Sequence, residues 1–90
     1  PFDMMKKEKL YEAFEELGQR LGVKIITGKG DFTGGTCVLN DEKVIVVNKH
    51  KPIEQRLKVL ATCFLDYNLE EFYVIPALRA FIEDTRSLLL

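Results

Sequence analysis

The stretch of sequence that decides the fold reads Gly34-Gly35-Thr36-Cys37-Val38-Leu39, then Asn40-Asp41-Glu42, then Lys43-Val44-Ile45-Val46-Val47-Asn48. Two short runs of mostly apolar and β-branched residues flank a turn in which Asn40 and Asp41 tolerate positive φ, and this pattern predicts a β-hairpin. Pro52 then opens a segment with apolar residues at helical spacing, which predicts a helix. The unit from Gly34 to Asp66 is therefore strand, tight turn, strand and helix.

The second strand of this hairpin is apolar on both of its faces. Val44 and Val46 point to one side and Ile45 and Val47 to the other, because successive side chains of a strand alternate. A half-exposed strand would alternate apolar with polar residues, so we expect this strand to be covered on both sides. Helices on both faces, or a second subunit on one of them, would supply the cover.

The flanking sequence completes a small α+β domain. An apolar stripe at helical spacing ends at Gly22, a β-branched strand covers residues 23–27, and a glycine-rich loop covers residues 28–35. Pro76 opens a third helix. We predict a single domain, residues 1–90, with an N-terminal helix, a small, mainly antiparallel three-stranded sheet, and two C-terminal helices packed on it. The apolar stripes of the first and third helices are Leu10, Phe14, Leu17 and Leu21, and Leu78, Phe81 and Ile82.

Composition and charge disfavour several classes of function. Thirteen basic and fourteen acidic residues in a chain of 90 leave a net charge of −1, whereas nucleic-acid binders usually carry a basic excess. No apolar run approaches the roughly 20 residues that a membrane helix needs, so no membrane association is expected. Two cysteines are too few for a secreted disulfide framework, which predicts a cytoplasmic protein with reduced thiols.

A metal or thiol site would have to be built from Cys37, His50, Cys63 and Asp66. Structural zinc sites usually pair ligands two to four residues apart, whereas Cys37, His50 and Cys63 follow each other at intervals of 13 positions. A cysteine–histidine nucleophile would need one thiol beside His50 and an environment that favours the thiolate, but both cysteines lie in apolar stretches. We predict no catalytic residue, no metal and no cofactor.

Two further patterns have simpler explanations than a binding site. The glycines at 28, 30 and 34 follow a strand, but a second strand comes next, so the helix N-terminus that meets a phosphate is missing. Basic residues occur in a small patch after the hairpin and again on the third helix, and a solvated face explains both. These basic residues are Lys49, Lys51, Arg56 and Lys58, and Arg79 and Arg86.

The central unit resembles the minimal zinc-peptidase domain of the ImmA/IrrE type. Val44-Ile45-Val46-Val47-Asn48 is similar to the family's apolar strand, and Arg56-Leu57-Lys58-Val59-Leu60-Ala61 to the lead-in of its active-site helix. The His-Glu-x-x-His motif is missing. Thr62 stands in place of the first histidine, Cys63 in place of the glutamate and Asp66 in place of the second histidine. The resemblance therefore implies a degenerate peptidase-like scaffold without its catalyst.

These observations favour a non-catalytic protein–protein interaction or regulatory module, and they leave enzymatic activity open. Two alternatives remain: a hydrolase with an atypical metal or thiol site, and a nucleic-acid accessory domain. We expect a homodimer and possible protein partners, because the leucine-rich tail and the doubly apolar strand exceed what so short a chain can cover. The expected interface residues are Phe81, Leu88 and Leu89, with Ile45 and Val47 as the alternative surface.

Overall fold

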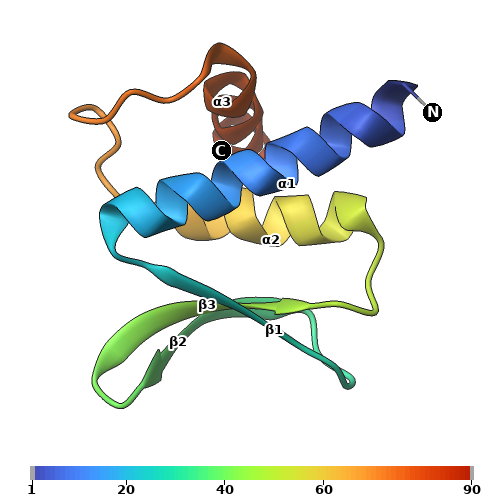
Figure 1. Ribbon diagram of the computed structural model, residues 1–90, viewed down its shortest axis with the longest axis vertical. Helices are drawn as coiled ribbons and strands as arrows, with labels where there is room; N and C mark the ends of the chain where they lie inside the picture. Colours follow the sequence, from blue (N-terminus) through green and yellow to red (C-terminus); the bar gives the residue numbers. More distant parts are fainter. Residues whose placement is uncertain (1, 90) are drawn as a thin grey trace.

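The computed structural model describes residues 2–89, with side chains described for residues 6–89, and confirms the predicted α+β fold (Figure 1). An N-terminal helix precedes a three-stranded sheet, and two helices follow it. The elements in chain order are α1 (Phe2–Leu21), β1 (Lys24–Gly28), β2 (Gly34–Leu39), β3 (Glu42–Asn48), α2 (Ile53–Phe64) and α3 (Pro76–Leu89).

The sheet has the order β1-β3-β2, so the doubly apolar strand β3 lies at its centre. β2 and β3 form the predicted antiparallel hairpin, with Leu39 opposite Glu42. β1 runs parallel to β3, with Ile25 opposite Ile45. Both β1 and β2 are therefore edge strands, and the sheet is mixed.

The hairpin turn has the predicted conformation. Asn40 and Asp41 have φ values of 51° and 68°, as the two central residues of a type I′ turn require. Such a turn matches the right-handed twist of the strands that it connects. It fixes the hairpin register, and with it the direction in which each side chain and each backbone group of β2 points.

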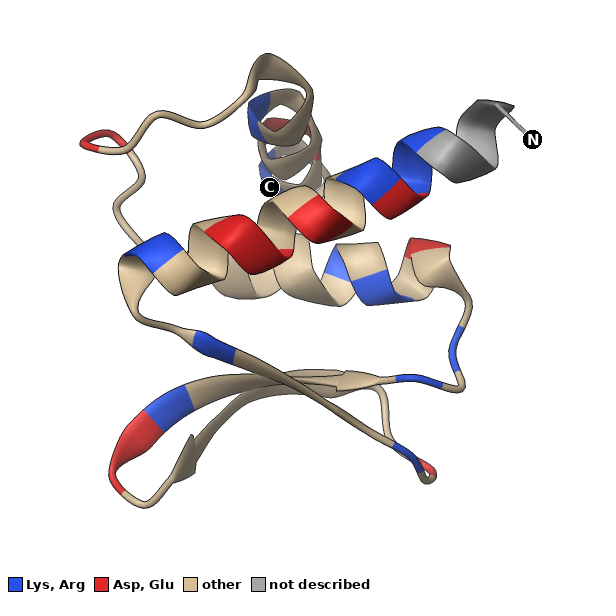
Figure 2. Ribbon diagram, in the orientation of Figure 1, with Lys and Arg blue, Asp and Glu red and all other residues tan. Residues whose placement is uncertain are grey.

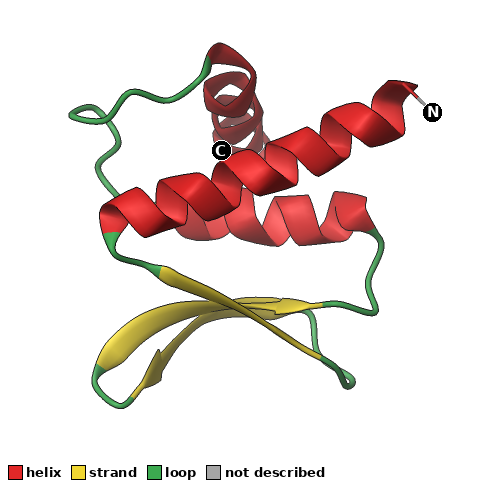
Figure 3. Cartoon of the chain, viewed as in Figure 1, coloured by secondary structure: helices red, strands yellow, loops and turns green. Residues whose placement is uncertain are grey.

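The helices α1, α2 and α3 all lie on one side of the sheet (Figures 1 and 3). The alternative in which helices of this chain cover both faces of β3 is therefore wrong, whereas cover of one face by a second subunit stays a prediction. Ile45 and Val47 are fully buried in the core beneath the helices. Val44 and Val46 point to the face without helices, where Val44 is nevertheless only 3% exposed because its cross-strand neighbours Lys24 and Cys37 flank it.

The core lies between the sheet and the helices and is built around aromatic rings. Phe14 of α1 stacks on Phe64 of α2 with ring centroids 5.6 Å apart. Phe81 of α3 meets Phe14 edge to face at 6.1 Å, and Tyr67 packs against Phe64 at 5.8 Å. These contacts join all three helices into one layer, which holds α2 in a fixed position over the sheet.

The end of α3 does not pack back on the body of the chain. Leu88 and Leu89 are 75% and 62% exposed, whereas Leu78 and Ile82 on the same helix are buried. Among the described residues, no helix is long and apolar enough to cross a membrane.

Candidate functional site

A groove of about 370 Å³ lies between the edge strand β2 and helix α2. Gly34 forms part of its floor. A Cβ atom added to Gly34 would lie 3.3 Å from Val59 Cγ1 and 2.6 Å from the backbone oxygen of Val46, so only glycine lets the strand approach so closely. The groove is lined by Thr33, Gly34 and Gly35 on the strand side and by Gln55, Lys58, Val59, Thr62 and Cys63 on the helix side.

The hairpin geometry leaves backbone groups of β2 free along this groove. In a hairpin closed by a two-residue turn, the residues that flank the turn exchange both backbone hydrogen bonds, and bonded and non-bonded pairs then alternate. Leu39, Cys37 and Gly35 therefore bond to β3. The backbone N–H of Lys49, just after β3, donates to the Gly28 carbonyl of β1 at 2.9 Å. This bond supports the alternation, because it shows that the backbone N–H of an odd-numbered residue at this end of β3 points to β1.

The N–H and C=O groups of Gly34, Thr36 and Val38 consequently lie in the plane of the sheet and point outward, away from β3. The side chains of Thr36 and Val38 point to the helix side, because Thr36 hydrogen-bonds with the Cys63 thiol on α2. Val38 is 63% exposed. The edge of β2 thus combines three free donor–acceptor pairs, an exposed valine and a glycine-floored groove.

No charge protects this edge. β2 has the sequence Gly-Gly-Thr-Cys-Val-Leu and is uncharged along its whole length (Figure 2). Natural proteins usually guard exposed edge strands with lysine, proline or a bulge, because an open edge is a template for pairing with another strand. The other edge strand, β1, begins with Lys24 and is followed by Lys29.

The loop that leads into β2 is held in place by a buried amide. Asn48, at the end of β3, is fully buried and donates from Nδ2 to the carbonyls of Gly30 and Phe32, at 2.9 and 2.6 Å. Its Oδ1 accepts a hydrogen bond from the backbone N–H of His50 at 3.0 Å. The loop therefore turns two of its carbonyl oxygens inward, and the Asn48 amide holds it in place.

The residues considered for a metal or thiol site lie apart. Cys63 is buried and faces β2, whereas Cys37 points to the opposite face of the sheet, and His50 and Asp66 are exposed on separate segments. Burial raises the pKa of the Cys63 thiol, the Asp66 carboxylate raises it further, and the hydrogen bond with Thr36 opposes them. Within residues 2–89, no three such side chains are grouped so that they could hold a metal ion.

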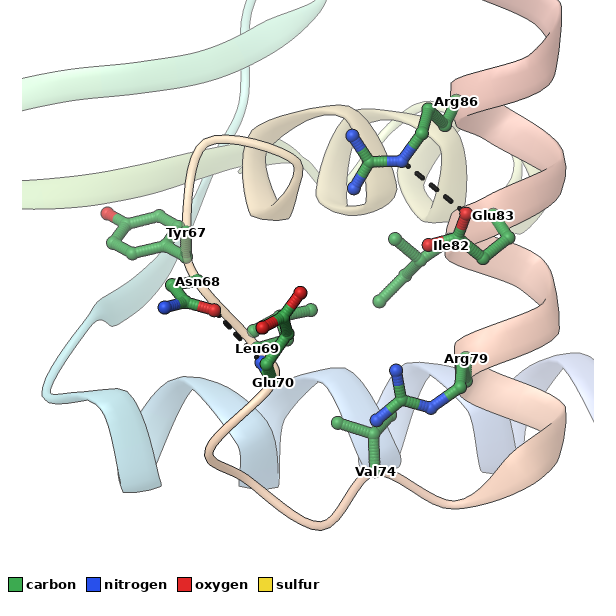
Figure 4. Close-up of a pocket in the computed structure, with 9 residues that line it drawn as sticks. All are labelled: Tyr67, Asn68, Leu69, Glu70, Val74, Arg79, Ile82, Glu83 and Arg86. Atoms are coloured by element: carbon green, nitrogen blue, oxygen red, sulfur yellow. Dashed lines mark hydrogen bonds and ion pairs between the residues drawn. The ribbon is translucent and has the colours of Figure 1, made fainter.

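In each of the two basic patches one arginine has a contact within the chain. The Arg56 guanidinium donates to the Lys51 carbonyl at 3.1 Å and lies over the Tyr11 ring, 5.3 Å from its centroid. Arg79 and Arg86 extend from α3 over a hollow of about 190 Å³ next to the connection between α2 and α3 (Figure 4).

Glu70 and Glu83 lie in the same hollow, and Arg86 Nε is 3.5 Å from Glu83 Oε2. Two cations and two anions therefore line this hollow. This balance gives the hollow no clear preference for a ligand of either charge.

The predicted interface residues divide into three groups. Leu88 and Leu89 are exposed at the end of α3, whereas Phe81 is half-buried and packs on Phe14. Ile45 and Val47 are fully buried, so they form no exposed surface, because the helices cover their face of β3. Neither Val38 nor the outward backbone groups of β2 belong to the predicted interface. The absence of charge in β2 was the signal that could have revealed an open edge.

Comparison of the chain with models of protein families, with curated proteins and with solved structures finds no match. The function is therefore inferred from the site alone.

Proposed function

We propose that the chain is a non-catalytic protein–protein interaction module, and that its binding site is the open edge of β2. The observation that carries this proposal is the set of outward backbone groups at Gly34, Thr36 and Val38 beside a groove with a glycine floor. An extended segment of a partner would add a strand at this edge, a recognition mode in which main-chain hydrogen bonds give affinity and side-chain pockets give specificity.

The groove determines which side chains such a segment would carry. Every second residue of an added strand would point to the helix side, next to Gly34, Val59 and Thr62. The groove is bounded by two glycines, two threonines, one valine, one cysteine, one glutamine and one lysine, so it suits β-branched side chains of moderate size. The remaining residues of the added strand would point to the face of the sheet without helices, beside Cys37.

A hydrolase built on Cys37, His50, Cys63 and Asp66 finds less support, because these side chains lie on different faces and segments. A nucleic-acid accessory domain finds less support as well, because Arg56 is engaged with Tyr11 and Lys51. Kinship with the zinc-peptidase scaffold stays a prediction, as does the cytoplasmic location. A homodimer is the assembly that we propose for the module.

The proposal is tested by selecting random peptides displayed on phage against the immobilised protein at low surface density. We expect enrichment of extended sequences with alternating β-branched residues. Thr36→Pro should abolish their binding, because Pro removes an outward N–H without breaking a bond to β3. Leu88→Glu is the matched control and should bind normally. Peptides that bind Thr36→Pro as well as the parent would show that the edge of β2 is not the site.

A further inference from the structure

The residues of β2 are complementary to a second copy of the same strand. In an antiparallel pair centred on Thr36, Gly34 of one copy lies opposite Val38 of the other, and Gly35 lies opposite Cys37. Val38 and Cys37 therefore each meet a glycine, whereas Thr36 meets its own copy and Leu39 lies opposite Thr33. On the helix side, Val38 would enter the groove beside Gly34 and Val59 of the second copy, and on the other side Cys37 would cover Gly35.

The backbone groups agree with the same register. Gly34, Thr36 and Val38 are the residues whose N–H and C=O groups point outward, and this register places them opposite Val38, Thr36 and Gly34 of the second copy. Residues opposite each other in an antiparallel pair can exchange both backbone hydrogen bonds, so all three free pairs of each copy would be satisfied. A shift of one residue between the two strands would place the outward backbone groups of one copy opposite groups of the other copy that already bond to β3.

Access and symmetry support this arrangement further. Among the described helices only α2 contacts β2, and it lies over one face of the sheet (Figure 1). A two-fold axis needs only one self-complementary patch, and this strand is such a patch.

We infer that the occupant of the β2 edge is β2 of a second copy, which joins two sheets into one of the order β1-β3-β2-β2-β3-β1. This inference rests on the proposed function, because it names the strand that the edge receives. It places the Cα atoms of the two Thr36 residues about 5.5 Å apart, as in a hydrogen-bonded antiparallel pair. The two Cys37 residues become diagonal neighbours at about 7–8 Å.

Disulfide trapping tests the register. The variant is Thr36→Cys in a background with Cys37→Ser and Cys63→Ala, because Cys63 lies near Thr36 and would otherwise compete. We expect a covalent dimer under mild oxidation, since about 5.5 Å lies within the range of Cα separations that a disulfide spans. The unmutated chain should link poorly through Cys37, whose separation of about 7–8 Å exceeds that range. Tyr73→Cys in the same background is the control for random collision, because Tyr73 is 70% exposed and lies outside β2, in the connection between α2 and α3.

Sedimentation equilibrium tests the assembly itself. We expect the parent to form dimers, and Val38→Lys to raise the dimer dissociation constant by about tenfold or more, because two buried valines are lost in each dimer. Thr36→Pro should be monomeric and folded, whereas Cys37→Pro should unfold, because its N–H bonds to β3. Val38→Lys keeps the test decisive even where a proline variant misfolds, since Val38 is exposed in the single chain.

The outcomes separate this inference from the proposed function. A monomeric parent that selects peptides, with selection abolished by Thr36→Pro, overturns the self-pairing and leaves the interaction module standing. A monomeric parent that selects no peptide overturns both. A dimer that survives Val38→Lys and Thr36→Pro places the interface elsewhere, and a dimer that Thr36→Cys does not trap overturns the register.

Discussion

Gly34 on β2 lies directly against Val59 on α2, so that a Cβ on this glycine would come within 3.3 Å of Val59 Cγ1. The same atom would be 2.6 Å from the carbonyl oxygen of Val46, which is rigid backbone. Gly34 also has a φ of 114°, which L side chains rarely adopt. The floor of the groove therefore depends on this one glycine.

Gly34→Ala should destabilise the fold by about 2–4 kcal/mol, because it combines a backbone clash with a strained φ. Gly35→Ala is the matched control. Gly35 has a φ of 151°, but a Cβ added to it would meet no described atom within 4 Å beyond its chain neighbours, so this variant should lose only about 1 kcal/mol. Urea denaturation of both variants measures the difference. Equal stability of the two would show that the contact with Val46 and Val59 is not tight.

Asn48→Ala should lower the free energy of unfolding by about 2–3 kcal/mol. The substitution leaves the carbonyls of Gly30 and Phe32 without their donor, and a buried unpaired polar group costs about 1–3 kcal/mol. Asn48→Asp should be at least as damaging at neutral pH, because a carboxylate would face two carbonyl oxygens. Urea denaturation measures both, and a loss below about 0.5 kcal/mol in each would contradict the role of this amide as the clamp of the loop.

The two thiols should differ in reactivity and in their effect on pH dependence. At pH 8 Cys37 should react with Ellman's reagent about tenfold faster than Cys63, because burial raises the pKa of the Cys63 thiol. The raised pKa favours the neutral thiol in the folded chain. The contribution of the Cys63 thiol to stability is therefore present at pH values below its unfolded pKa of 9.0. It is lost as the pH rises through the higher pKa of the folded chain.

Cys63→Ala should remove this part of the pH dependence, so between about pH 8 and 10 its stability should fall less steeply than that of the parent. Cys37→Ala serves as the control and should follow the parent. Rapid reaction of both thiols, or identical slopes for Cys63→Ala and the parent, would show that Cys63 is not shielded in solution.

The end of α3 offers a second surface, and one variant distinguishes it from β2. Leu88→Glu with Leu89→Glu should leave self-association unchanged, because both residues lie at the exposed end of α3 and neither lies in the proposed interface. Phe81→Glu is unsuitable, since Phe81 packs on Phe14 and its loss would disturb the core. Sedimentation equilibrium decides between the surfaces: a monomeric double variant would place the dimer interface on α3.

Much of the fold follows from local sequence signals. The turn at Asn40–Asp41 specified the hairpin, Gly22 with a φ of 74° ended α1, and Pro52 preceded α2 as expected. These signals were readable because each rests on the conformational preference of one or two residues.

The arrangement of the layers could not be read in the same way. The alternation in β3 gives two apolar faces, but it does not say which face the helices cover, since either parity would satisfy the pattern. The predicted surface at Ile45 and Val47 was therefore wrong, and Val44 and Val46 lie on the face without helices. The groove depends on strand order and on the contact between Gly34 and Val59, which are distant in sequence and unmarked by any motif.

Amide hydrogen exchange at single residues of β2, followed by NMR as the protein concentration is raised, tests the central claim most directly. The amides of Gly35, Cys37 and Leu39 bond to β3 and should be protected at every concentration. Those of Gly34, Thr36 and Val38 should exchange rapidly in dilute protein and become protected as it concentrates. Rapid exchange of the three outward amides at every concentration, in a protein that sediments as a dimer, would contradict the account.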